Sequence, residues 1–224
     1  MSIINIEMFN NHVRQVKEFT LTCDTLEDYL RNIKYSGENR IKDDTVENLL
    51  LPPIALTFYN NFYECGIIPT ETELIDEYLD QPYFKVMGDT VEVNYDNRVV
   101  VVSKEGLIGR VLRTYPSLIR DFHFYLMVYE SREFDAVRYS FIDDYQGKVD
   151  LKILYKGKWY NVGLLLGSKR SLFYRFKKKF RHKDVDLIYI ELNKSEADWV
   201  GDFMLYTQTH LKQLIKQIKK SKPI

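Results

Sequence analysis

The sequence predicts an α/β protein of the mixed α+β kind, with a mostly helical N-terminal region at residues 1–100 and an α/β domain at residues 101–224. Apolar residues recur at helical spacing through most of the first region. The second region contains a run of aromatic and β-branched residues at 135–166, which is typical of strands. A basic helical segment and another apolar strand follow that run, and this order favours a mixed sheet flanked by helices.

Capping residues and prolines define the helices expected in the first region. A helix at residues 11–35 is predicted to be capped at Thr25, with acidic residues in the turn behind it. Pro52 and Pro53 end one helix and open the next, because proline lacks a backbone donor and suits the first helical turn. Gly66 is expected to end that second helix.

A third helix and a hairpin complete the first region. Thr70 and Glu73 form the pattern of a capping box, which predicts a helix from that point to about Asp80. Residues 85–103 predict a small hairpin that turns within YDNR, because Asp and Asn tolerate positive φ. No repeat or low-complexity linker marks the boundary near residue 100.

The second region is predicted to begin with a helix that breaks at Tyr115-Pro116, because a residue before proline avoids the helical conformation. Strands follow, with turns at Asp143-Asp144 and at Gly157. Ser168 is expected to cap a basic helix. The remaining predicted elements are a strand at 186–192, a short strand at 202–207 and a closing helix at 210–220.

Composition indicates an ordinary globular protein. The 224 residues are 45% hydrophobic and 29% charged, enough to bury one sizeable core. No apolar run is long enough to span a membrane and no signal peptide is visible, so a cytoplasmic location without a membrane partner is expected. Cys23 and Cys65 lack metal-site spacing and are expected to be reduced packing residues.

The net charge of zero conceals two oppositely charged regions. Residues 151–224 contain 17 Lys and Arg against 6 Asp and Glu, whereas residues 1–150 contain 15 against 26. A basic surface on the second region favours a polyanionic partner. The alternative is that the two regions attract each other within the fold.

Two adjoining segments resemble a known nuclease family. Gly147-x-x-Asp150 at the start of one strand and YKGKWYNVGL as the next resemble the PD-(D/E)xK superfamily of restriction-endonuclease-like nucleases, over roughly residues 105–192. The resemblance implies a restriction-endonuclease-like sheet domain that cleaves phosphodiesters with Mg²⁺ held by carboxylates and a lysine beside the attacking water. Asp150 matches the strand acid, and Glu105 is the candidate acid on the first helix. Together they would hold the metal.

The second strand departs from the family pattern, because Gly163 and Leu165 stand where an acid and a lysine are expected. Lys169, at the end of this strand, is the candidate catalytic lysine. The candidate substitutes for the missing acid are Asp121, Asp143 and Asp144.

Asp150 also fits a purely structural interpretation, as a solvent-facing residue at the start of a strand. Alternation along a strand places Asp150, Lys152 and Leu154 on one face and Val149, Leu151 and Ile153 on the other.

The basic segment SKRSLFYRFKKKFRHK, residues 168–183, predicts a helix with a Leu and Phe stripe toward the core. Its N-terminus joins hydroxyls and unpaired amides to the positive end of the helix dipole, a combination that holds phosphate. A merely solvated helix face is the alternative, and His123 and His182 suggest no metal or catalytic role. The residues expected to contact phosphates are Ser168, Arg170, Ser171, Arg175, Lys177, Lys178 and Arg181.

These observations predict a nucleic-acid-associated protein with a divergent nuclease-like domain, and as its activity a Mg²⁺-dependent endonuclease that hydrolyses DNA. The alternative is a catalytically inactive nuclease-like fold, of a phage or mobile-element type, that binds DNA, RNA or a protein partner. A third interpretation is a pocket for a small phosphorylated ligand at the Ser168 helix end.

Overall fold

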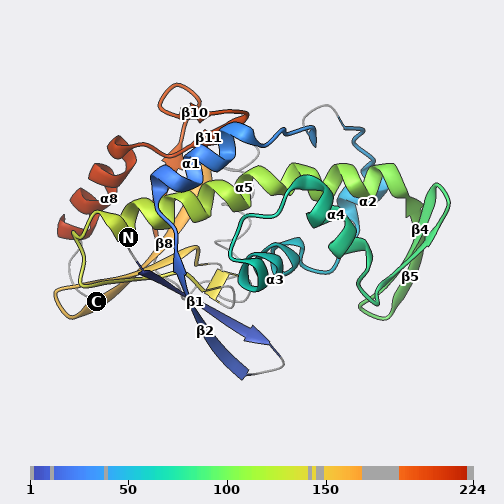
Figure 1. The fold of residues 1–224 in the computed structure, drawn as a ribbon, viewed down its shortest axis with the longest axis horizontal. Helices are drawn as coiled ribbons and strands as arrows, with labels where there is room; N and C mark the ends of the chain where they lie inside the picture. The colour runs from blue at the N-terminus through green and yellow to red at the C-terminus, as the bar shows by residue number, and fades with distance from the viewer. Residues whose placement is uncertain are drawn as a thin grey trace. The chain divides into compact units, whose positions relative to one another are not determined.

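The structure is a computed structural model that describes residues 3–10, 13–37, 40–140, 143–144, 149–167 and 187–220. The chain forms two compact units, one made of Met1–Asn32 with Arg120–Ile224 and the other of Ile33–Ile119. Both helices and mixed sheets are present (Figure 1), so the predicted α+β class is confirmed. These compact units do not test whether residues 1–100 and 101–224 are separate domains, so the predicted division near residue 100 stays a prediction.

The first unit contains a mixed four-stranded sheet in the order β6-β7-β8-β9. Its strands β6, β7 and β8 are antiparallel neighbours, whereas β8 and β9 run parallel. The mixed sheet expected from the sequence is therefore present. The strands are β6 (Ala136–Arg138), β7 (Leu151–Tyr155), β8 (Lys158–Leu166) and β9 (Leu187–Leu192).

One face of β7 belongs to the core. Leu151 and Ile153 are buried, while Lys152 and Leu154 on the other face are half-buried. This alternation is the one predicted from the sequence, and it continues into Asp150 just before the strand, which is also half-buried.

Helix α5 (Lys104–Glu130) is one continuous helix, so the predicted break at Tyr115-Pro116 is wrong. Proline lacks the N–H that would bond to the carbonyl of residue 112. Side chains supply other bonds around this point, because the Thr114 hydroxyl donates to the Arg110 carbonyl and the Ser117 hydroxyl to the Thr114 carbonyl. Tyr115 is fully buried and its hydroxyl donates to the Pro69 carbonyl, which anchors the helix where its own bonding is interrupted.

The N-terminus is the second place where the prediction is wrong. Residues 3–20 form the antiparallel hairpin of β1 (Ile3–Asn10) and β2 (Val13–Thr20), and only Cys23–Asn32 forms a helix, α1. Thr22 caps this helix in place of Thr25, because the two threonines exchange hydrogen bonds between backbone N–H and hydroxyl. The mainly helical N-terminal region is thus only loosely matched.

The second unit follows its local sequence signals. Helix α3 ends at Gly66, whose φ of 72° is the left-handed conformation of a helix C-cap. Thr70 and Glu73 form the predicted capping box at the start of α4. The helices of this unit, besides part of α5, are α2 (Asp44–Asn48), α3 (Ile54–Cys65) and α4 (Glu71–Leu79).

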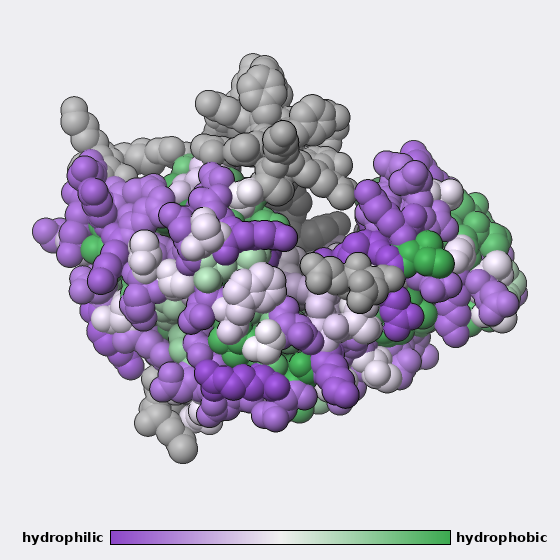
Figure 2. All heavy atoms as spheres, turned by 90° about the horizontal axis from the view of Figure 1, so that it is seen from above, coloured by the Kyte–Doolittle hydropathy of each residue, from purple (hydrophilic) through white to green (hydrophobic). Residues whose placement is uncertain are grey.

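A three-stranded antiparallel sheet, β3 (Phe84–Met87), β4 (Thr90–Tyr95) and β5 (Arg98–Ser103), also belongs to the second unit. The predicted turn lies at Asp96 and Asn97, which have positive φ of 53° and 60°. Val99 and Val101 on β5 are more than half exposed, and apolar side chains are visible at the end of the molecule where β4 and β5 lie (Figure 2).

The chain after β9 stays in the first unit. β10 (Asp198–Val200) and β11 (Phe203–Leu205) form a short hairpin, and helix α8 (Gln208–Lys220) buries Leu211, Leu214 and Ile218. Within the described ranges, no helix is long and apolar enough to cross a membrane.

Candidate functional site

Asp150 lies at the entry to β7 and ties that strand to β8. Its backbone N–H donates to the Val162 carbonyl at 3.0 Å, and its carboxylate oxygen Oδ2 accepts from the Leu164 N–H at 2.5 Å. The same oxygen would lie 3.9 Å from a Cβ added at Gly163. Asp150 therefore has a structural bond to the neighbouring strand while its carboxylate stays at the half-buried face of the sheet.

Asp121 lies on α5, in the part of the helix that belongs to the same unit as Asp150. Burial raises the pKa of Asp121 from 3.8 to about 7, the nearby Arg120 guanidinium lowers it, and the Asp144 carboxylate raises it further. Arg120 is itself almost fully buried, and its Nε lies 3.9 Å from Asp121 Oδ1. Because burial outweighs this distant ion pair, the pKa of Asp121 lies above its ordinary value.

Two buried tyrosines lie within electrostatic reach of the three acids. Burial raises the pKa of Tyr139, and the Asp144 and Asp150 carboxylates raise it further. Burial likewise raises the pKa of Tyr206, to which Asp121 and Asp150 also contribute. The Tyr206 hydroxyl donates to the Leu165 carbonyl at 3.4 Å, one residue from the Leu164 N–H that Asp150 accepts.

Asp121, Asp144 and Asp150 therefore share one neighbourhood around Tyr139 and Tyr206, and we call these five residues the acidic cluster. Like charges held close together at partly buried positions disfavour full ionisation. Such an arrangement suits a carboxyl group that exchanges protons near neutral pH.

Lys152, on the same face of β7 as Asp150, forms an ion-paired group with Asp143 and Arg138. Lys152 Nζ lies 2.6 Å from Asp143 Oδ1, and Arg138 Nε lies 3.6 Å from Asp143 Oδ2. Asp143, one of the acids considered as a substitute, is thus neutralised by two cations. Its pairing makes Asp143 a poorer metal ligand than Asp121 or Asp144.

The residues predicted for catalysis do not all lie in the same part of the structure. Glu105 is exposed in the first turn of α5 and belongs to the unit Ile33–Ile119, whereas Asp150 belongs to the other unit. The structure therefore does not assign Glu105 and Asp150 to one site. The remaining predicted residues, namely Ser168, Lys169, Arg170, Ser171, Arg175, Lys177, Lys178 and Arg181, lie outside the described residues.

The described residues do not complete a metal site by themselves. In the parts of the chain that the structure describes, no three His, Cys, Asp or Glu side chains are arranged to hold a metal ion. The acidic cluster has the charge that a divalent cation requires, but the protein ligands for an all-carboxylate site are not assembled in it. The described carboxylates therefore do not fit a bound divalent ion on their own.

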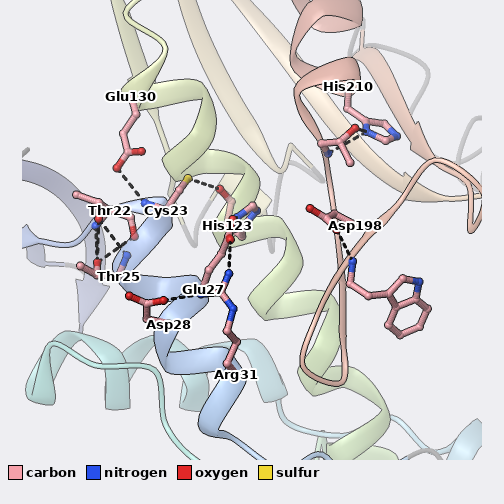
Figure 3. A network of polar contacts seen from close by, with 12 residues as sticks. Thr22, Cys23, Thr25, Glu27, Asp28, Arg31, His123, Glu130, Asp198 and His210 are labelled. Carbon is pink, nitrogen blue, oxygen red and sulfur yellow. Dashed lines mark hydrogen bonds and ion pairs between the residues drawn. The ribbon is translucent and has the colours of Figure 1, made fainter.

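A separate polar network links α1 to α5 in the same unit (Figure 3). His123 is buried, and its Nε2 lies 3.1 Å from Glu27 Oε1. Burial lowers the pKa of His123, and Glu27 opposes the shift. Glu130 Oε1 accepts from the Cys23 N–H at 3.0 Å. This network is an internal support of the helix pair, as expected for His123, and His182 lies outside the described residues.

Cys23 and Cys65 are both free cysteines, and Cys23 is half-buried. Cys65 is exposed, so its predicted packing role is wrong. Burial raises the pKa of the Cys23 thiol, so it is a weak nucleophile. Tyr139 and Tyr206 are the members of the acidic cluster that sequence reasoning missed, because nothing in their local sequence distinguishes them from packing aromatics.

No protein-family model matches the chain, and no curated protein or solved structure is significantly similar to it.

Proposed function

We propose that this chain is a nucleic-acid-associated protein whose first unit carries a divergent nuclease-like site. Two features support the proposal. The order of α5, β6, β7, β8 and β9, with the last two strands parallel, agrees with the mixed sheet that the resemblance implies. Asp150 begins β7, the strand on which the resemblance expects an acid.

The observation that carries the proposal is the acidic cluster. Asp121 replaces Glu105 as the helix acid, because Asp121 lies on α5 within the unit of Asp150 and both act on the Tyr206 hydroxyl. A carboxyl group with a pKa of about 7 is matched to proton transfer near neutral pH.

A cleavage assay tests the proposal. The wild-type chain is incubated with plasmid, single-stranded DNA and RNA, with and without Mg²⁺ or Mn²⁺. Asp150→Asn keeps an acceptor for the Leu164 N–H but removes the charge, so it is expected to reduce cleavage at least a hundredfold without lowering the melting temperature. Asp198→Ala removes an exposed acid of the β10–β11 hairpin and is the control. Equal activity in Asp150→Asn and the wild type would refute a nuclease centred on Asp150.

Binding without cleavage is the second candidate function, and β8 favours it. Gly163 and Leu165 stand at the positions of the family's acid and lysine, and the amine of Lys152 is paired with Asp143. If the chain binds without cleaving, the plasmid stays intact and the chain retards nucleic acid in a gel shift. Phosphate contacts release counterions, so the affinity should fall steeply as salt rises. The double variant Lys177→Glu with Lys178→Glu tests whether the basic segment supplies those contacts.

A further inference from the structure

Strand β5 is an edge strand of the three-stranded sheet in the second unit, so one of its sides has no neighbouring strand among the described residues. The hydrogen-bonding phase identifies the residues that face this side. The Lys104 N–H donates to the Asp89 carbonyl at 2.9 Å, which continues the ladder between β4 and β5. Because bonded and non-bonded pairs alternate in an antiparallel ladder, Val99 and Val101 direct their N–H and C=O groups away from β4.

The backbone groups of Val99 and Val101 form an open edge, because no described residue donates to them or accepts from them. Helix α2 also contacts β5, yet the side chains of Val99 and Val101 are 62% and 54% exposed. Proteins commonly protect such an edge with a charged residue, a proline or a bulge. The stretch from Val99 to Val102 has no charged residue or proline, and its register with β4 is unbroken. This edge can therefore accept a further strand.

The opposite edge of the same sheet is less suited to pairing. Strand β3 has only 4 residues, and one of them is Lys85. The Asn94 N–H donates to the Tyr83 carbonyl, so the alternation directs the Phe84 backbone groups outward. The Phe84 N–H already donates to the Gln81 carbonyl at 3.0 Å. A partner strand therefore finds more free backbone groups on β5 than on β3.

A second copy of β5 is complementary to this edge when it runs in the antiparallel direction. Val99 then lies opposite Val101 of the second copy, and Val101 opposite its Val99. Each of these pairs exchanges two hydrogen bonds between the outward backbone groups. Opposite residues of an antiparallel pair project to the same face, so the exposed valines of the two copies pack against each other.

The free backbone groups favour this register over its neighbours. A shift toward α5 would require the Ser103 carbonyl for pairing. Ser103 caps α5, since its hydroxyl accepts from the Gly106 N–H at 3.1 Å, and the carbonyl of a capping residue accepts the first bond of the helix. A shift in the other direction would require Asn97, which has φ of 60° and is not extended.

The charges at the ends of β5 favour the same register. Continuing outward from the valine pairs, Asp96 of one copy lies near Lys104 of the other, and the two-fold symmetry repeats this contact. Within the described part of the chain, neither Asp96 nor Lys104 forms an ion pair of its own. Arg98 lies opposite Val102 of the second copy, so the register does not bring like charges together.

We propose that two copies of this chain associate through β5 as a two-fold antiparallel pair, which joins their three-stranded sheets into one continuous sheet. The inference does not depend on the proposed nucleic-acid association. Because the same edge is used by both copies, the contact is complete after two chains. A pair of edge strands buries less surface than a standard stable interface, so the dimer should form at high protein concentration and dissociate on dilution.

Sedimentation velocity of the full chain over a series of protein concentrations tests the proposal. We expect the sedimentation coefficient to rise with concentration from that of one chain to that of two. The double variant Val99→Lys with Val101→Lys places like charges opposite each other and should weaken the dimer at least about tenfold. Met87→Lys, at an exposed residue of the opposite edge strand, is the matched control and should associate like the wild type.

Two further variants test the backbone pairing and the register. Val101→Pro removes an N–H that makes no bond to β4, so it should preserve the fold and abolish association. Asp96→Lys should weaken the dimer, and the added substitution Lys104→Asp should restore it. The melting temperature of each variant is measured beside that of the wild type to show that the monomer is folded.

Four outcomes would overturn the inference. A chain that stays monomeric at every concentration has no such interface. If the lysine double variant dissociates but Val101→Pro still dimerises, the valines pack face to face and strand pairing is refuted. If Lys104→Asp fails to rescue Asp96→Lys, the register is refuted. Association that continues beyond two copies would show that β5 does not form a closed pair.

Discussion

Replacing Asp121 by Asn should change how the stability of the protein depends on pH. The two side chains have nearly the same shape, but Asn cannot ionise. Folding raises the pKa of Asp121 from 3.8 to about 7, so the folded state binds its proton more tightly than the unfolded state does. The stabilisation from this group is fully present below pH 3.8 and is lost as the pH rises through 7.

The size of the effect follows from the shift. Each pH unit between the two pKa values changes the free energy of unfolding by about 1.4 kcal/mol. The wild type should therefore lose about 3 kcal/mol between pH 5 and pH 8 through Asp121, and Asp121→Asn should not. For a chain of this length, about 3 kcal/mol corresponds to about 5–10 °C in melting temperature. The melting temperature of Asp121→Asn should therefore rise by about 5–10 °C relative to that of the wild type between pH 5 and pH 8.

The assay is thermal unfolding of both proteins at pH 5 and pH 8. His123 and His210 act in the opposite direction, since burial lowers the pKa of each and acid must charge them, but their contributions cancel between variant and wild type. Asp96→Asn, in the exposed β4–β5 turn, is the control and should follow the wild type at both pH values. A constant difference between Asp121→Asn and the wild type would show that Asp121 is solvated, and the acidic cluster would lose its central member.

Two further predictions concern the framework. Thr70→Ala removes the hydroxyl of the α4 capping box and should lower the free energy of unfolding by about 1 kcal/mol in urea, whereas Thr72→Ala, at an exposed position of the same helix, should change it little. Leu26→Ala leaves a cavity under α1, where Leu26 is fully buried, and should cost about 3 kcal/mol by the same measurement; a loss below 1 kcal/mol would mean that α1 does not pack as described.

Local chemistry made much of the fold predictable. Gly66, the Thr70 capping box and the Asp96-Asn97 turn each act through a few adjoining residues, and the structure contains all three. Pro116 shows the limit of such reasoning. Its local effect is to break a helix, but the buried Tyr115 anchors α5 from outside the local sequence and the helix continues. The N-terminal hairpin was missed because residues 11–20 fit a helical pattern, and strand pairing with residues 3–10 is a longer-range preference.

The candidate site was predictable only in part, for a related reason. The position of Asp150 at a strand start follows from alternation along its own segment. Its relation to Asp121 depends on how α5 lies against the sheet, which periodicity does not report. Glu105 was chosen as the acid that the resemblance implies on the first core helix, but the helix belongs to two units, and Glu105 lies in the unit that does not contain Asp150.

Gly163 stands where the resemblance expects an acid, and its packing leaves no room for one. A Cβ added at this buried glycine would lie 2.9 Å from Cε1 of Tyr189, which is closer than atoms in contact approach, so any side chain must displace that ring. An acid there would also place a second negative charge close to Asp150, since the same Cβ would be 3.9 Å from Asp150 Oδ2. Tyr189 on β9 thus occupies the space in which an acid would extend from β8. The proposed site would therefore take its second carboxylate from another element, and Asp121 on α5 lies within the same unit.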